Sequence, residues 1–389
     1  MKLRIATFAL ILTAAAAHAQ RHQLGTVNAE TPEGQLLQQI GQESDEAKKL
    51  ALMEKFAAAA PKHEGIGWVY EQMQASYVKS GQPDKVIAAG EKLLSLDPDD
   101  LEAAHQNLKA SEAKKDPDLI RKWSDQTSVL ARKMAASPQP KEADEVETWK
   151  KRVDYAKQVD TYTEYSIYAA TLQSTDPRKR LELIDALLTR NPKSQYAGQL
   201  THLQFAVYRQ LNDNAKALAL AEKTLETDQT DEDMLAMVTN EYVEKKRDPE
   251  KVIAYSAKIV ELMATKPKPQ GVSDEDWDKK KKSLSGVAHY MSGSTYFNQK
   301  KYKEADKELR AALPLVEGSD QLKAATLFQL GLSNFNMKSL PDALRFNELC
   351  AAIKSQFQAK AAENARVLRS QGVSTGAPAA QKKAAPKKK

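Results

Sequence analysis

The chain has 389 residues, of which 28% are charged and 41% hydrophobic, and its formal net charge is +6. It is rich in Ala, Leu, Lys, Glu and Gln, which favour helices, and poor in the β-branched residues that strands favour. Lys2 and Arg4 supply two of the positive charges and residues 371–389 supply five, so the rest of the chain is nearly neutral. The helix-favouring composition leads us to expect an all-α protein. A body without excess positive charge does not fit a fold that binds nucleic acid over its own surface.

The first 19 residues predict a cleaved secretory signal peptide. Lys2 and Arg4 form a charged start, residues 5–17 form an apolar run, and Ala17-His18-Ala19 has the pattern of a cleavage site. The apolar run is shorter than the roughly 18 residues that span a bilayer, and no later stretch is apolar enough to do so. We expect the mature chain to begin at Gln20, to have no transmembrane segment, and to be exported to the periplasm or the extracellular space. An uncleaved anchor or an ordinary buried helix is the alternative.

After a linker at residues 20–32, three blocks of helical repeats are expected at residues 33–136, 144–266 and 273–370. The segments between them, 137–143 and 267–272, each contain two prolines, which disfavour continuous helix. They are predicted to be joints between blocks or, alternatively, longer loops inside one array. Ser273 precedes three acidic residues and is predicted to cap a helix. Residues 371–389 are a low-complexity stretch rich in Gly, Ala, Pro and Lys, and they predict a disordered tail.

Short motifs recur along the body of the chain. Residues 83–88, PDKVIA, return as residues 249–254, PEKVIA, and both open an amphipathic helix with a proline and an acidic residue. Pro117 begins a similar helix 34 residues after Pro83. Windows of this length fit the pattern at 67–100, 161–194, 198–231, 286–319 and 324–357, less closely at 101–134 and 233–266, and in degenerate form at 33–61.

These windows resemble the tetratricopeptide repeat, a helix–turn–helix unit of about 34 residues. The residues that carry the resemblance are Tyr70, Met73, Tyr77, Gly81, Leu93 and Pro98 in the first good window, Gly293, Tyr296, Ala305 and Leu309 in 286–319, and Gly331, Ala343 and Cys350 in 324–357. The resemblance, to an exported bacterial type, implies an α-solenoid of antiparallel helix pairs wound into a superhelix. Small residues such as Gly293 and Gly331 would let two helices approach closely, and each pair would need its neighbours to cover its apolar face. An unrelated helical bundle is the alternative.

The resemblance also implies a binding groove. In tetratricopeptide proteins, ligands lie on the concave face lined by the first helix of each unit, chiefly at unit positions 2, 5, 9, 12 and 13. Carried onto this sequence, the groove residues are Trp68, Glu71 and Lys79; Tyr162, Tyr165 and Gln173; His202, Arg209 and Gln210; Tyr290, Phe297 and Asn298; and Phe328, Phe335 and Asn336. Aromatic side chains with polar neighbours indicate a surface that binds a protein or peptide. Alternatively, each aromatic packs against the next unit. Because few of these positions are Lys or Arg, the basic clamp with which some family members hold a peptide carboxylate is not expected.

No motif for catalysis is present. The histidines are scattered, the sequence has neither a phosphate-binding loop nor a nucleophile elbow, and the one cysteine, Cys350, lies in a helical pattern and is expected to be buried. The acidic runs 231–233 and 274–276 precede apolar helices and are predicted to act as caps. We therefore expect no enzyme activity, no cofactor and no metal. Hydrolysis by paired carboxylates from distant repeats is the alternative left open.

The end of the chain carries a second candidate site, an anionic-surface contact. It consists of Lys382, Lys383, Lys387, Lys388 and Lys389. Lipid headgroups, acidic wall polymers or nucleic acid would attract these lysines, but no aromatic residue lies among them to stack on bases. A merely solubilising extension is the alternative. The sequence thus predicts an exported scaffold that binds a protein or peptide in its groove, with a cell-envelope or nucleic-acid-associated protein acting through this tail as the alternative function.

Overall fold

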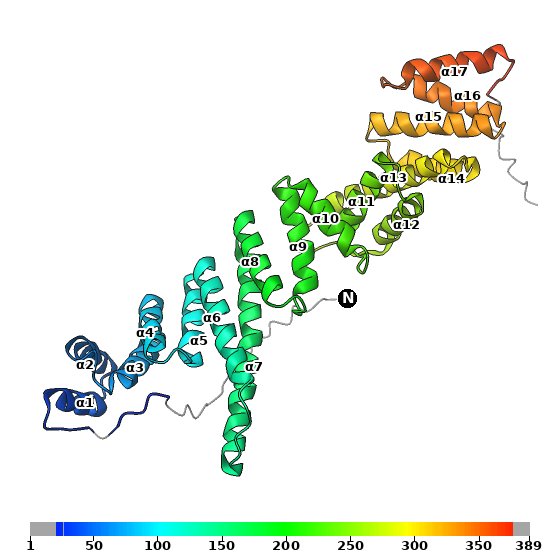
Figure 1. The fold of residues 1–389 in the computed structure, drawn as a ribbon. Helices are drawn as coiled ribbons and strands as arrows, with labels where there is room; N and C mark the ends of the chain where they lie inside the picture. The colour runs from blue at the N-terminus through cyan, green and yellow to red at the C-terminus, as the bar shows by residue number, and fades with distance from the viewer. Residues whose placement is uncertain (1–20, 26, 376–389) are drawn as a thin grey trace, which may run out of the picture. The chain divides into compact units, whose positions relative to one another are not determined.

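A computed structural model describes residues 21–25 and 27–375 (Figure 1). These residues form helices and no strand, so the all-α prediction is confirmed for the described part of the chain. The predicted signal peptide and the five tail lysines lie outside the described residues. The helices up to residue 190 are α1 (Pro32–Gln42), α2 (Glu46–Ala59), α3 (Ile66–Lys79), α4 (Pro83–Leu96), α5 (Leu101–Lys114), α6 (Pro117–Ala135), α7 (Ala143–Gln173) and α8 (Pro177–Arg190). The later helices are α9 (Ala197–Gln210), α10 (Asn214–Thr224), α11 (Glu232–Glu244), α12 (Pro249–Thr265), α13 (Asp274–Asn298), α14 (Tyr302–Ala312), α15 (Asp320–Asn336), α16 (Leu340–Ala351) and α17 (Gln358–Ser370), with a 3₁₀ turn at Leu313–Leu315.

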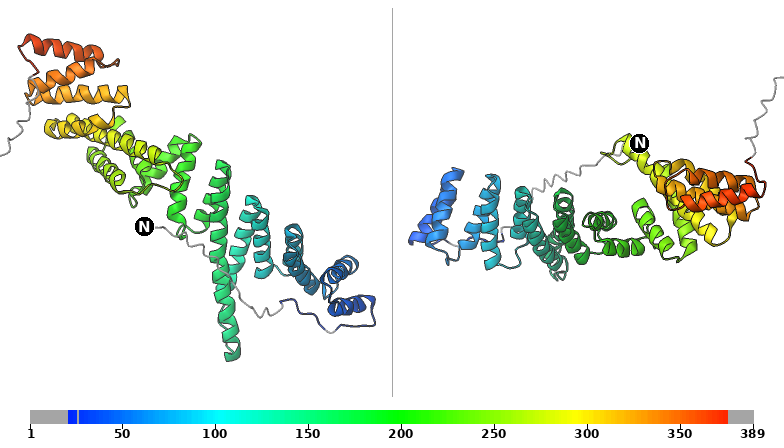
Figure 2. Two further views of the ribbon diagram at one scale, coloured as in Figure 1. Left: turned by 180° about the vertical axis from the view of Figure 1, so that it is seen from behind. Right: turned by 90° about the horizontal axis from the view of Figure 1, so that it is seen from above.

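The chain folds into two compact units, residues 1–200 and 201–389, whose division falls inside α9. In the first unit each helix from α3 to α7 contacts the next one, and α3, α5 and α7 also contact one another in sequence. In the second unit α11, α13 and α15 do the same, and α15, α16 and α17 are stacked side by side (Figures 1 and 2). Contacts between alternate helices are what stacked antiparallel hairpins produce. The predicted α-solenoid of helix pairs is therefore confirmed.

Helix starts follow from local sequence. Most of the second helices of the pairs begin with proline at the first or second position, where the missing N–H has no helical partner to lose. Aspartate or serine side chains accept a hydrogen bond from the first turn of many helices. Ser273 is one of them, since its hydroxyl accepts from the backbone N–H of Asp276 at 3.0 Å, as the sequence predicts.

Two first helices are longer than one unit requires. α7 has 31 residues and α13 has 25, and both begin directly after the proline-containing segments. The first of these segments runs back along the start of α7, where the indole N–H of Trp149 donates to the carbonyl and hydroxyl oxygens of Ser137, both at 3.1 Å. The first turns of α7 therefore hold the proline-containing segment that precedes them.

Helix pairs cross where one partner has almost no side chain. A Cβ atom on Gly293 would lie 2.7 Å from Leu309 of α14, and one on Gly331 would lie 2.6 Å from the amide nitrogen of Asn347 of α16. Real Cβ atoms do not approach other atoms this closely. The close approach that the sequence predicts at Gly293 and Gly331 is therefore confirmed, and it lets the buried faces of α13–α14 and α15–α16 interlock.

Candidate functional site: faces of the first helices

The first helices of the last two pairs carry a surface without charge. Residues 286–298 of α13 and 324–336 of α15 contain no Asp, Glu, Lys or Arg, although 28% of the whole chain is charged. The helical period places positions 2, 5, 9, 12 and 13 of each unit on one side of its helix. The opposite side of α15 is buried through Leu327 and Leu330. α13 and α15 contact each other, and the Gln329 side-chain amide of α15 donates to the Ser294 hydroxyl of α13 at 3.0 Å.

We call this surface the α13–α15 face and define it by Tyr290, Phe297, Phe328, Leu332 and Phe335, with Asn298 and Asn336 beside them. Tyr290, Phe297 and Phe328 are partly buried against a common core cluster, and burial raises the pKa of Tyr290.

Neighbouring aromatic side chains hold two of these rings in place. Phe328 stacks on Phe357, just before α17, with ring centroids 5.1 Å apart, and Phe297 meets Tyr302 edge to face at 5.7 Å. Phe335 stays 45% exposed, with the Lys338 ammonium 5.7 Å from its ring centre. Tyr290, Phe297 and Phe328 of this face are thus held by packing, and the ring of Phe335 projects from it.

In the first unit the predicted residues Tyr162 and Tyr165 lie together on α7. The Tyr162 hydroxyl donates to Glu112 of α5 at 2.5 Å, and its ring lies 5.3 Å from that of His105, so Tyr162 joins two first helices. Tyr165, 6.3 Å from the Tyr162 ring centre, is exposed. Two exposed apolar residues on first helices were missed by sequence reasoning, Val78 of α3 and Leu172 of α7. Both occupy position 12 of their units, so the family frame applied to every unit would have found them.

The remaining predicted residues have varied surroundings. Trp68 is partly buried, Lys79 is exposed with Glu46 at 3.8 Å, and Glu71 accepts the backbone N–H of His22 at 3.2 Å. In the second unit the exposed Arg209 lies 3.4 Å from the side-chain oxygen of Asn214. Gln173, Gln210, Asn298 and Asn336 are exposed. The structure therefore brings together one predicted set within each unit, Tyr162 with Tyr165, and Tyr290 with Phe297 and Phe328 against a common core cluster.

Histidines on the first helices differ sharply in environment. His105 is buried on α5, and its Nδ1 lies 3.0 Å from the Tyr155 hydroxyl, which itself donates to Glu102. Because that hydroxyl proton is used, Nδ1 must be the donor, and Nε2 has no partner within the described residues. Burial, with Lys109 nearby, lowers the pKa of His105 to about 4. His202 of α9 instead lies 3.0 Å from Asp231 and 3.1 Å from Asp228, and these hydrogen bonds raise its pKa.

These two histidines should give the two units opposite responses to pH. The pKa of His105 is below its ordinary value of 6.5, so the unfolded chain takes up a proton first, and the first unit loses stability as the pH falls from about 6.5 towards 4. The pKa of His202 is raised, so its contribution to the second unit is complete below 6.5 and is lost as the pH rises through its folded pKa. Histidine-resolved NMR titration checks both. We expect His105→Gln to reduce the loss of stability of the first unit as the pH falls below about 6.5, and a His105 signal that titrates near 6.5 would contradict the assignment.

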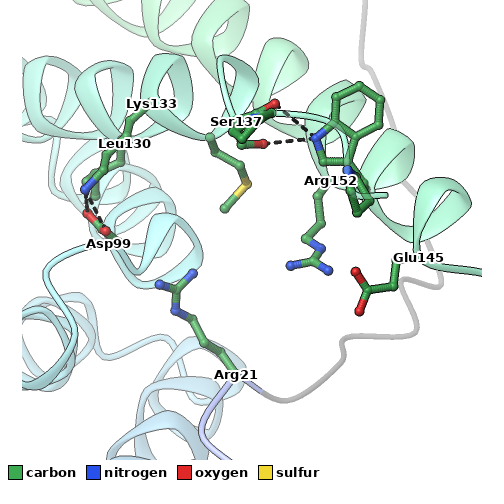
Figure 3. Close-up of a pocket in the computed structure, with 11 residues that line it drawn as sticks. Arg21, Asp99, Leu130, Lys133, Ser137, Glu145 and Arg152 are labelled. Atoms are coloured by element: carbon green, nitrogen blue, oxygen red, sulfur yellow. Dashed lines mark hydrogen bonds and ion pairs between the residues drawn. The ribbon is translucent and has the colours of Figure 1, made fainter. Parts of the chain in front are cut away.

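A cavity of about 390 Å³ opens beside the start of α7 (Figure 3). Trp149 and Arg152 of α7 and Pro138 and Pro140 of the preceding segment line it, and Arg21 reaches in across the cavity from Arg152. Lys133 and Asp99 also line it, and the Lys133 ammonium binds both carboxylate oxygens of Asp99 at 2.6 Å. Sequence reasoning missed this cavity, because it treated residues 20–32 as a linker and gave Arg21 no position.

Two kinds of feature are absent from the described residues. No group of three or more His, Cys, Asp or Glu side chains there is placed to hold a metal ion. None of the described helices is both long and apolar enough to cross a membrane.

Comparison with known proteins points to the same repeat. Residues 287–314, which run from α13 through α14, match the family model described as tetratricopeptide repeat. No curated protein sequence matches the chain. Among solved structures, a chain of the APC/C hetero-tetramer Cut9–Hcn1 is similar with 14% identity over 88% of this chain and 57% of that chain, with a TM-score of 0.32. This chain thus spans little more than half of that one.

The TPR domain of P58(IPK) is similar with 13% identity over 88% of this chain and 99% of that chain, with a TM-score of 0.24. The family match falls on the window 286–319 that carries Gly293, Tyr296, Ala305 and Leu309. The hairpin it covers, α13–α14, contributes one of the two helices of the α13–α15 face. The chain is therefore a protein that contains a tetratricopeptide repeat.

Proposed function

We propose that this protein is an exported interaction scaffold that binds a partner protein or peptide on the α13–α15 face. The observation that carries the proposal is the pair of adjacent first-helix stretches, 286–298 and 324–336, which are uncharged and present four aromatic rings. Covering these two stretches desolvates no Asp, Glu, Lys or Arg side chain of their own, whereas burying an unpaired charge is costly. Aromatic rings held by packing also lose little freedom on binding, which suits them as anchors. The partner segment should therefore offer apolar side chains to Tyr290, Phe328 and Phe335.

Location is part of the same proposal. The charged start, apolar run and Ala17-His18-Ala19 pattern support export by a cleaved signal peptide, to the periplasm or the extracellular space. The partner would then be another exported protein. The lysine-rich residues 382–389 support a second, weaker contact with an anionic surface, which salt would weaken steeply.

Site-directed cross-linking tests the binding face. Cys350 is buried and its pKa is raised to about 11, so thiol reagents should label an introduced cysteine preferentially. Phe335→Cys places a photoactivatable probe on the α13–α15 face, and Leu349→Cys places it on α16 at matched exposure, 46% against 45%. In cells of the source organism we expect adducts from position 335 that position 349 does not give.

The captured protein is then purified and titrated against variants of the full chain. Phe335→Asp should weaken its binding at least tenfold, because a charged group that the partner must desolvate replaces the projecting apolar ring, whereas Leu349→Asp should leave binding unchanged. Equal capture from both cysteines, or equal affinity of both aspartate variants, would exclude this face as the binding surface. Helix content measured by circular dichroism shows that each variant remains folded.

A further inference from the structure

Residues 21–25 are held against the first unit by specific contacts. The Arg21 guanidinium forms a two-point ion pair with Asp97, with Nη2 to Oδ1 at 3.0 Å. The His22 backbone N–H donates to Glu71 of α3 at 3.2 Å, and its imidazole Nε2 lies 3.2 Å from Asp100. Asp100 also caps α5. We call residues 21–25 the strap. It joins the start of α3 to the loop between α4 and α5.

Two glycines make room for the strap. A Cβ atom on Gly67 would lie 2.7 Å from Nδ1 of the His22 ring, and one on Gly65 would lie 2.8 Å from Cδ1 of Leu24. A glycine inside a helix costs roughly 1 kcal/mol relative to alanine, so Gly67 has no advantage for α3 itself. Its place in the sequence is explained by the imidazole that lies over it. The surface is therefore shaped for a histidine followed two residues later by a leucine.

The strap also borders two cavities. Arg21 lines the cavity of about 390 Å³ beside Trp149, and His22 lines a second one of about 560 Å³ formed with residues 61–67, Leu96 and Asp97. Its contacts are few and partly exposed, since the Arg21 and Asp97 side chains keep 39% and 28% of their accessible surface. A short chain connection raises the effective concentration of such a segment to the millimolar range. A tethered segment can thus occupy a site for which its own affinity is modest.

We propose that Gly65, Gly67, Glu71, Asp97 and Asp100 form a recognition site for a chain segment of the pattern Arg-His-x-Leu, and that the strap occupies it as an internal ligand. Asp97 selects the cationic residue and Asp100 the imidazole, Glu71 binds the backbone N–H of the histidine, and the opening above Gly65 selects the leucine. A partner segment of the same pattern exchanges with the strap. This site lies in the first unit and is separate from the α13–α15 face.

The test uses the full chain and a labelled synthetic peptide with the strap sequence, RHQLG. In the triple variant Arg21→Glu, His22→Ala and Leu24→Ser, the strap no longer fits and the site is vacated. We expect this variant to bind the peptide at least tenfold more tightly than the unaltered chain, measured by fluorescence anisotropy. Adding Gly67→Ala and Asp97→Asn to the triple variant should abolish binding, because one fills the histidine position and the other removes the charge.

Several outcomes would overturn the proposal. A triple variant with unchanged helix content that does not bind the peptide would do so, as would equal binding of a scrambled peptide or equal affinity of the unaltered chain. Amide hydrogen exchange provides a measurement that needs no peptide. The His22 amide should exchange slowly in the unaltered chain and at least tenfold faster in Gly67→Ala, with Gly41→Ala, where a Cβ meets nothing within 4 Å, as the control. Fast exchange at His22 in the unaltered chain would also refute it.

Discussion

Replacing Gly90 by alanine is expected to destabilise the first unit by about 2–4 kcal/mol, because overpacking a core costs about 1–3 kcal/mol and loss of a buried hydrogen bond adds about 1 kcal/mol. Gly90 lies on α4, and a Cβ there would come within 2.2 Å of Asn107 Oδ1 and 2.4 Å of Gln74 Nε2. These two atoms are 3.1 Å apart and hydrogen-bonded to each other. The same amide of Gln74 donates to the Ala103 carbonyl at 3.2 Å. The added methyl group would therefore separate α3, α4 and α5 where they meet.

Amide hydrogen exchange is the suitable measurement, since a repeat array need not unfold in one step. Exchange in α3–α5 should become roughly a hundredfold faster in Gly90→Ala. The matched control is Gly41→Ala, in α1, where a Cβ atom meets nothing within 4 Å. That variant should gain up to about 1 kcal/mol from helix propensity alone. If both variants stabilise the chain, the packing explanation for Gly90 is wrong.

Gly90 also marks a limit of prediction from sequence. In the windows 286–319 and 324–357 the small residue lies at position 8, where the family pattern places it, and Leu309 and Asn347 at position 24 fill the space. In 67–100 the order is reversed, because position 8 is Gln74 and the glycine is Gly90 at position 24. A pattern that specifies a small residue at one position misses a pair in which the glycine lies on the other helix. Close packing depends on the combined volume of the two facing side chains, and either helix can supply the small one.

The same distinction applies to the candidate site. The resemblance to the repeat family singled out Tyr290 and Phe297 of α13 and Phe328 and Phe335 of α15, and the period of a helix puts the two residues of each helix on one side of it. Neither could show that Phe328 rests on Phe357 or that Tyr162 binds Glu112, since those partners come from other helices. The strap was missed for a similar reason. Five residues without helical periodicity contain no signal of their own, and their position follows from Gly65, Gly67 and Asp97 far along the chain.

Truncation of Phe346 to alanine should cost the second unit about 3–5 kcal/mol, the usual loss for a buried phenylalanine. Phe346 lies on α16, is 1% exposed, and belongs to the core cluster beneath the α13–α15 face. The guanidinium groups of Arg310 and Arg345 lie 4.9 and 5.1 Å from its ring centre. Arg310 is fixed there by Asp306 at 2.8 Å and Asp342 at 2.9 Å, so the ring fills a prepared space that the variant leaves empty.

Phe335→Ala is the matched control, because it removes the same side chain from the neighbouring helix of the same unit at 45% exposure. We expect it to change stability by about 0.5 kcal/mol or less, yet to weaken partner binding. Phe346→Ala should speed hydrogen exchange in α14–α17 and leave exchange in α3–α6 unchanged, since a repeat contacts only its neighbours. Phe346→Ala should also weaken partner binding, because it loosens the core cluster against which Tyr290 and Phe328 pack. Equal destabilisation by the two variants would show that Phe335 is a core residue, and the α13–α15 face would then lose its projecting anchor.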